Sequence, residues 1–86
     1  LGDGYYIAES IQKGGGSFVN GVIDGIQKNP ARKGNVPVFE KVTSEQMTKE
    51  NFKPGPEDIG KIFIETDTQK VYEFDNNLQA VMIYSR

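Results

Sequence analysis

The sequence predicts a mainly β fold with short helical segments, in which a glycine-rich N-terminal half precedes a C-terminal three-stranded antiparallel meander. Two observations lead to this fold class. The last third of the chain holds three short apolar runs that are rich in β-branched and aromatic residues, which favour strands. Most of the ten glycines lie within the first 34 residues, where they raise the entropy lost on ordering the backbone.

The first expected element is a strand at Tyr5–Ala8, because aromatic and aliphatic residues follow one another there. Gly14–Gly16 cannot hold a regular element at low cost and is expected to be a connector. A short helix or an irregular turn is expected over Ser17–Lys28, because apolar residues recur there every four positions, the spacing of a helical stripe, and Ser17 is placed to cap it. A strand–turn–strand arrangement with its turn at Asn20 stays open, because a glycine inside a helix costs about 1 kcal/mol relative to alanine.

An extended edge strand is expected over Val36–Val42, because Pro37 disfavours helix at the residue before it and suits the edge of a sheet. Thr43 and Gln46 have the spacing of a capping box, which predicts one to two helical turns over Ser44–Asn51. A proline- and glycine-rich stretch ends this helix. It divides the chain into 1–53, which holds the strand, the short helices and the edge strand, and 54–86, which holds the meander; together they form one small domain or a fragment of a longer chain.

The meander comprises three strands joined by two turns. The apolar runs are Ile62–Ile64, Val71–Phe74 and Val81–Tyr84, and the polar turns are Thr66–Gln69 and Asp75–Asn77. In the second of these turns, Asn is expected to take the left-handed backbone conformation. Alternation places Tyr72 and Phe74 on one face of their strand, with Val71 and Glu73 on the other. We expect Tyr72 to lie in the core. Both faces of the first two strands carry apolar residues, so one face is expected to meet a partner subunit.

Composition excludes several function classes. Among the 86 residues there is no cysteine and no histidine, which removes disulfides, thiolate metal sites and the commonest general base. The net charge is −2 and basic residues are scattered, which disfavours nucleic-acid binding, and no apolar run is long enough to cross a membrane. No catalytic, metal-binding or cofactor-binding residues are predicted, because no nucleophile–base set can be assembled and Lys13 precedes the glycines rather than following them as in a P-loop.

The stretch from Gly60 to Asp75, G-K-I-F-I-E-T-D-T-Q-K-V-Y-E-F-D, resembles a hairpin that recurs in bacteriophage tail-fibre, baseplate and head-decoration proteins. In those proteins a glycine precedes an apolar run, a Thr/Asp-rich turn follows, and lysine, a small apolar residue and tyrosine come next. They often continue with glycine and tryptophan, where this chain has Asn76-Asn77 and Leu78. The resemblance covers residues 60–86 and implies a structural role in a virion. It carries over no catalytic or ligand-binding residues.

We therefore expect a structural component of a phage particle, from a fibre, tail or capsid decoration, that is not an enzyme and is located in the virion. The partners are expected to be further copies of the chain or other virion proteins, with a host surface glycan as a possible ligand. Candidate assembly contacts are Gly15, Gly21, Gly25, Phe63 and Tyr84. The alternative is a small cell-surface adhesion or carbohydrate-binding β-module that uses exposed tyrosines.

Overall fold

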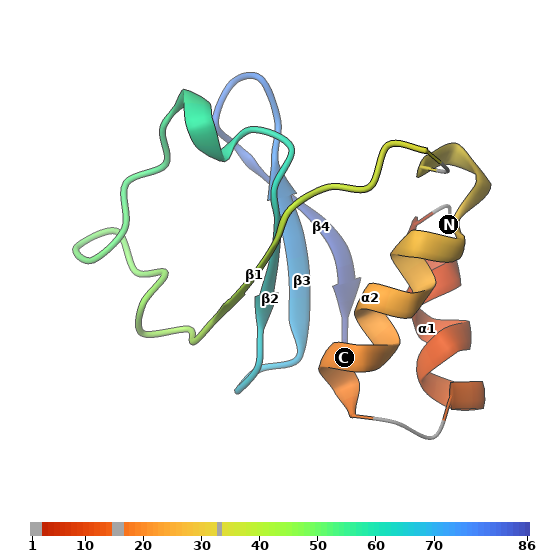
Figure 1. The fold of residues 1–86 in the computed structure, drawn as a ribbon. Helices are drawn as coiled ribbons and strands as arrows, with labels where there is room; N and C mark the ends of the chain where they lie inside the picture. Colours follow the sequence, from red (N-terminus) through yellow and green to blue (C-terminus); the bar gives the residue numbers. More distant parts are fainter. Residues whose placement is uncertain (1–2, 15–16, 33) are drawn as a thin grey trace. The chain divides into compact units, whose positions relative to one another are not determined.

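A computed structural model describes residues 3–14, 17–32 and 34–86 of the chain, and Figure 1 shows its helices and strands. The chain divides into two compact units, Leu1–Val36 and Pro37–Arg86. The boundary expected between residues 53 and 54 falls inside the second unit.

The fold combines helices and strands, so the prediction of a mainly β chain holds only roughly. Helices α1 (Asp3–Gly14) and α2 (Phe18–Lys28) span 12 and 11 residues. The second unit holds one four-stranded mixed sheet. Its strands are β1 (Phe39–Val42), β2 (Ile62–Glu65), β3 (Lys70–Phe74) and β4 (Ala80–Ser85). Short 3-10 helices lie at η1 (Pro30–Arg32) and η2 (Pro56–Asp58).

The prediction of a strand at Tyr5–Ala8 is wrong, because these residues lie inside α1. Ile7 and Ile11 are four residues apart and therefore share one face of the helix. Ile7 has no exposed surface. A helix satisfies its own backbone hydrogen bonds, whereas a strand at this position would need a neighbouring strand. Tertiary packing has overridden the local preference of the aromatic residues for strand.

The helical interpretation of residues 18–28 is confirmed, and the strand–turn–strand alternative is wrong. The Ser17 hydroxyl caps α2 by accepting a hydrogen bond from Asn20 N at 3.2 Å. Helices α1 and α2 lie side by side (Figure 1). Two glycines of α2 lie against α1. A Cβ atom at Gly25 would lie 2.8 Å from Ile7 Cα, and one at Gly21 would lie 2.7 Å from Ile11 Cγ1. The helices can pack this closely only because these two positions lack side chains.

The sheet has the strand order β1-β2-β3-β4. Strands β2, β3 and β4 pair antiparallel, as expected of the meander, with Phe63 opposite Tyr72 and Tyr72 opposite Met82. Strand β1 pairs parallel with β2, with Glu40 opposite Phe63, so the sheet is not antiparallel throughout. The predicted edge position of β1 is confirmed, although the strand begins two residues after Pro37.

A crossover over residues 43–61 joins the two parallel strands, as a parallel pair requires. The predicted helix over Ser44–Asn51 is wrong, because this stretch consists of turns. Both capping-box bonds exist: Thr43 N donates to Gln46 Oε1 at 2.9 Å, and Gln46 N donates to Thr43 Oγ1 at 3.2 Å. The Glu45 carbonyl accepts from the Thr48 hydroxyl and from the Asn51 side-chain amide. These side chains offer the backbone an alternative to continued helix.

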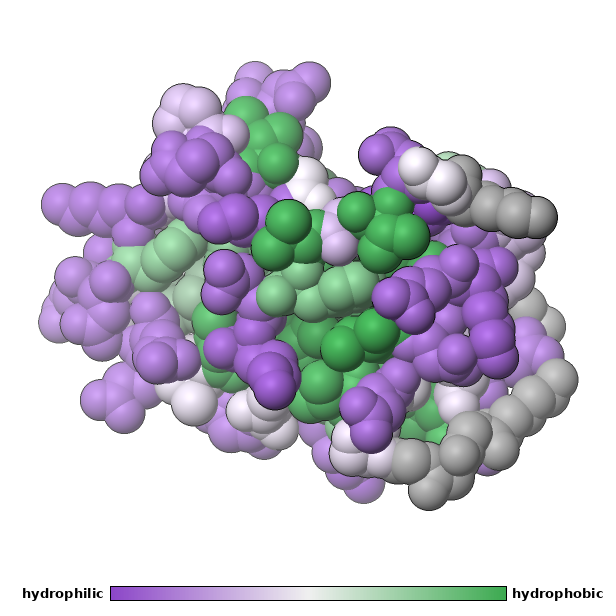
Figure 2. All heavy atoms as spheres, viewed as in Figure 1, coloured by the Kyte–Doolittle hydropathy of each residue, from purple (hydrophilic) through white to green (hydrophobic). Residues whose placement is uncertain are grey.

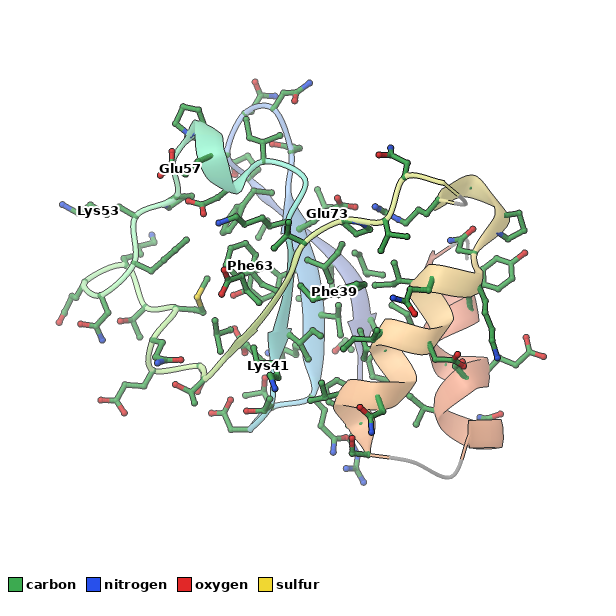
Figure 3. All side chains as sticks on the ribbon, in the orientation of Figure 1. Phe39, Lys41, Lys53, Glu57, Phe63 and Glu73 are labelled. Carbon is green, nitrogen blue, oxygen red and sulfur yellow. The ribbon has the colours of Figure 1, made fainter. Side chains whose placement is uncertain are left out.

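One face of the sheet carries an aromatic cluster that the crossover covers. Figure 3 labels its member Phe63. Its buried members are Phe63, Tyr72 and Phe74, and Val42, Met47 and Phe52 pack against them. The ring centroids of Phe52 and Phe63 are 5.6 Å apart in an edge-to-face arrangement, a favoured geometry for aromatic pairs. Tyr72 is 6% exposed, which confirms the prediction that it is a core residue.

Both hairpin turns contain a residue other than glycine in the left-handed region. Gln69 has φ +57° at the end of the β2–β3 turn, and Leu78 has φ +60° in the β3–β4 turn. The expectation that Asn takes this conformation in the second turn is therefore wrong. Asn77 N instead donates to Asp75 Oδ1 at 2.8 Å, and Gln79 N donates to the same oxygen at 3.0 Å. The carboxylate of Asp75 thus organises the loop, which leaves Leu78 to reverse the chain.

Candidate functional site

The sheet ends in β1 on one side and β4 on the other, and neither strand has an outer neighbour among the described residues. Edge strands present unpaired N–H and C=O groups, which natural proteins shield with shortness, proline or charge. Strand β1 has all three kinds of shielding. It is four residues long, Pro37 lies just before it, and Glu40 and Lys41 lie within it. Figure 3 labels Lys41 on this strand.

Strand β4 has none of these three kinds of shielding, and its only irregularity in the described sheet is a register shift after Met82. It is six residues long, and no charged residue or proline occurs from Gln79 to Ser85. Val81 and Met82 are 45% and 53% exposed, although both are large and apolar. A register shift opposite Val71 and Tyr72 interrupts its pairing with β3 after Met82. The regular part of this edge therefore covers Ala80–Met82.

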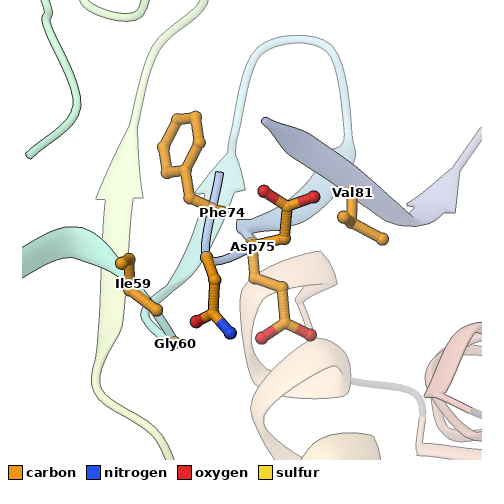
Figure 4. A pocket seen from close by; sticks show the side chains of 7 residues that line it. Ile59, Gly60, Phe74, Asp75 and Val81 are labelled. Atoms are coloured by element: carbon orange, nitrogen blue, oxygen red, sulfur yellow. The ribbon is translucent and has the colours of Figure 1, made fainter. Parts of the chain in front are cut away.

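A shallow hollow adjoins Val81 at the end of the β3–β4 hairpin, and Figure 4 shows it from close by. Residues that line it include Ile59, Gly60, Glu73, Phe74, Asp75 and Val81. Gly60 has φ +87°, a conformation that favours glycine, which gives a physical reason for glycine before the apolar run of β2. Ile59 is 38% exposed, so the apolar surface of Val81 continues into the hollow.

A second hollow lies between β1 and the crossover. Its apolar floor includes Val42, Met47, Phe52 and Phe63. The rim is charged, and Lys61 Nζ lies 3.5 Å from Asp58 Oδ1 and 3.9 Å from Glu40 Oε1. Asp58 is buried and also accepts a hydrogen bond from Gly55 N at 2.9 Å. Lys61 therefore forms ion pairs with both Asp58 and Glu40. The surface around the crossover is largely hydrophilic, as the left part of Figure 2 shows.

Polar groups inside the second unit hold the aromatic cluster in place. Burial raises the pKa of the Tyr72 hydroxyl, and the nearby Glu65 carboxylate, which is hydrogen-bonded to it, raises that pKa further. Thr68 Oγ1 donates to Glu65 Oε1 at 2.6 Å. No buried side-chain nitrogen or oxygen in the described part of the chain lacks a partner. The polar side chains of Tyr72, Glu65 and Thr68 are therefore hydrogen-bonded to one another within the protein.

The residues predicted as assembly contacts do not form one surface among the described residues. Gly15 lies outside the described residues. Gly21 and Gly25, both predicted as assembly contacts, lie close to the backbone of α1 in the same chain. Phe63 is buried in the aromatic cluster, and Tyr84 is half-buried on β4. Of the four candidates that the structure describes, only Tyr84 lies on a strand at the edge of the sheet.

Several apolar residues of β2 and β3 are buried. Ile62, Ile64 and Val71 have no exposed surface. The accessible apolar side chains of the sheet are instead Val81 and Met82, which sequence reasoning did not single out. The sequence does contain a signal for this exposed edge, namely the uncharged run Gln79–Ser85. The run indicates an exposed edge only when the strand order is known.

The described residues contain no group of three or more side chains suited to hold a metal ion. No described helix is long and apolar enough to span a bilayer. In comparisons with known proteins, no protein-family profile matched the chain, and neither did any curated protein or solved structure.

Proposed function

We propose that this chain is a structural component of a bacteriophage particle that works through protein–protein assembly and performs no catalysis. The observation that carries the proposal is the outer edge of β4, which has no charge or proline and has Val81 and Met82 exposed on it. A strand edge of this kind is a template for pairing with another chain. The hairpin pattern from Gly60 to Asp75, which resembles that of virion proteins, supports the choice of particle.

The carbohydrate-binding alternative rests on exposed tyrosines. Tyr72 is buried, and Tyr6 and Tyr84 are half-buried. Ring faces that stack on sugars must be accessible, so none of these three tyrosines favours this alternative. A glycan-binding assay with the purified chain separates the two functions.

The proposal is tested on particles from the organism that encodes the chain. Particles are purified on a density gradient and probed with an antiserum against the recombinant chain. We expect the protein to band with the particles in a constant ratio to their major proteins, and immunogold labelling to mark one substructure. If the protein stays in the soluble fraction while complete particles band without it, the virion role is refuted.

A further inference from the structure

We infer that the outer edge of β4 pairs with the β4 strand of a second copy of this chain, antiparallel and with Val81 on the two-fold axis. This inference rests on the proposed assembly function and adds the partner and the register. It begins with the direction of the backbone groups. Asp75 N donates to the Gln79 carbonyl at 3.0 Å, so that carbonyl faces β3.

Backbone direction alternates along an antiparallel pair. Val81, which lies opposite Glu73, therefore turns its N–H and C=O toward β3. Ala80 and Met82 turn theirs away from β3, toward the open side of the sheet. The register shift after Met82 ends this regular pattern. The groups available for pairing are thus the N–H and the C=O of Ala80 and Met82.

A two-fold axis through Val81 satisfies all of these groups at once. It places Ala80 opposite Met82 of the second copy, and Met82 opposite Ala80 of the second copy. Both are then hydrogen-bonded pairs, and the two Val81 residues form a non-hydrogen-bonded pair on the axis. Because neighbouring side chains on a strand point to opposite faces, the contact covers Val81 on one face and Met82 on the other.

The absence of charge favours a second copy as the occupant. Pairing β4 with itself brings no like charges together, because the run from Gln79 to Ser85 has none. Self-pairing of β1 about Glu40 would place two carboxylates opposite each other. The hollow lined by Ile59 and Phe74 adjoins Val81 and extends the contact beyond the strand. The regular edge is short, so the association is expected to be reversible and dependent on concentration.

The absence of cysteine from the chain allows a direct test of the register. A Val81→Cys variant carries one thiol, which the axis places beside its counterpart at a Cα separation of about 4.5 Å, within the range of a disulfide. Val38→Cys is the matched control, because Val38 is 60% exposed and lies just before β1. Under mild oxidation we expect the Val81→Cys dimer to form about tenfold faster than the control dimer. Equal rates overturn the proposed register.

A charge-swap experiment tests the same contact without a covalent bond. Val81→Lys and Val81→Glu place like charges on the axis, so each variant alone is expected to sediment as a monomer where the parent associates. An equimolar mixture places opposite charges together and is expected to restore the dimer. Circular dichroism checks that both variants keep the fold, which is expected because Val81 is nearly half exposed.

The outcomes separate this inference from the proposed function. If both charge variants associate as the parent does, the β4 edge is not the contact, while assembly through another surface stands. A parent that is monomeric at every concentration overturns self-pairing and leaves the virion role to the particle experiment. If the protein is absent from particles but the mixture restores the dimer, the contact stands and the virion role fails.

Discussion

Asp67, in the turn between β2 and β3, accepts hydrogen bonds from both the backbone N–H and the hydroxyl of Ser44, which lies 23 residues earlier in the chain. Its Oδ1 accepts from Ser44 N at 3.0 Å, and its Oδ2 accepts from Ser44 Oγ at 2.5 Å. Just beside them, Thr66 N donates to the Val42 carbonyl at 3.0 Å. These bonds fix the start of the crossover to the tip of the hairpin, and so hold the segment that covers the aromatic cluster.

The first prediction concerns the pH dependence of this contact. The hydrogen bond from the Ser44 hydroxyl, followed by that from its backbone N–H, lowers the pKa of Asp67 below its ordinary value of 3.8. A carboxyl whose pKa is lowered on folding stabilises the protein above its unfolded-state pKa, and this contribution is lost as pH falls through the folded-state pKa. Asp67→Asn should therefore lower the melting temperature near neutral pH, and its difference from the parent should shrink as the pH falls to about 2.

Ser44→Ala provides the matched control for Asp67→Asn. Because the two residues contact each other, the double variant is expected to lose less than the sum of the single losses. Thermal melts across the pH range measure both effects. Additive losses, or a difference that does not change with pH, would contradict the assignment of the contact to a charged Asp67.

The second prediction concerns the left-handed residue Gln69. Its φ of +57° strains a side chain that has a Cβ atom, whereas glycine adopts this conformation freely. We expect Gln69→Gly to stabilise the protein by roughly 0.5–1 kcal/mol, although it removes the 2.9 Å bond from Arg86 Nη1. Gln69→Ala loses the same bond and keeps the strain, so it should give no gain. Chemical denaturation measures all three proteins, and equal stability of the two variants would argue against strain at this position.

The third prediction concerns Tyr72 in the aromatic cluster. Tyr72→Ala should cost roughly 3–5 kcal/mol, as expected when a large buried aromatic side chain is truncated. Tyr72→Phe keeps the ring and loses only the hydroxyl that contacts Glu65, so it should cost about 1 kcal/mol. Urea denaturation measures both losses. A Tyr72→Ala variant that melts close to the parent would show that the cluster does not support the fold.

The stability of the protein at alkaline pH gives an independent check on the Tyr72 hydroxyl. Its pKa is raised above the ordinary value of 10.0, so the folded state binds its proton more tightly than the unfolded state does. This contribution to stability is complete below the unfolded-state pKa and is lost as pH rises toward the folded-state pKa. We expect the difference in stability between Tyr72→Phe and the parent to become smaller above about pH 10. The urea midpoints of the two proteins measure this difference.

The fourth prediction concerns the crossing of α1 and α2. A Cβ atom at Gly25 would lie 2.8 Å from Ile7 Cα and 2.8 Å from the Tyr6 carbonyl oxygen, and backbone atoms cannot move aside cheaply. Gly25→Ala gains about 1 kcal/mol of stability from helix propensity, whereas overpacking of the crossing costs about 1–3 kcal/mol. We therefore expect the free energy of unfolding to decrease. Gly21→Ala meets mainly the Ile11 side chain and should cost less. Denaturation of the two variants compares them, and stabilisation by Gly25→Ala would contradict the close crossing.

The sequence by itself determined the elements that depend on local patterns. Alternation of apolar residues placed the strands of the meander and put Tyr72 in the core. Four-residue spacing and the Ser17 cap placed α2. These features are visible in a short window, because side-chain direction and capping depend on neighbours a few residues away.

The tertiary structure decided the features that depend on distant partners. Residues 5–8 are helical because α1 packs against the glycines of α2, which outweighs their local preference for strand. The parallel pairing of β1 with β2 required knowledge of strand order, and so did the exposure of Val81 on β4. The turns at 44–51 formed although the capping box was satisfied, because side chains along this segment bond to its backbone and to Asp67. Contacts between residues far apart in the sequence settled these points, and no local window contains them.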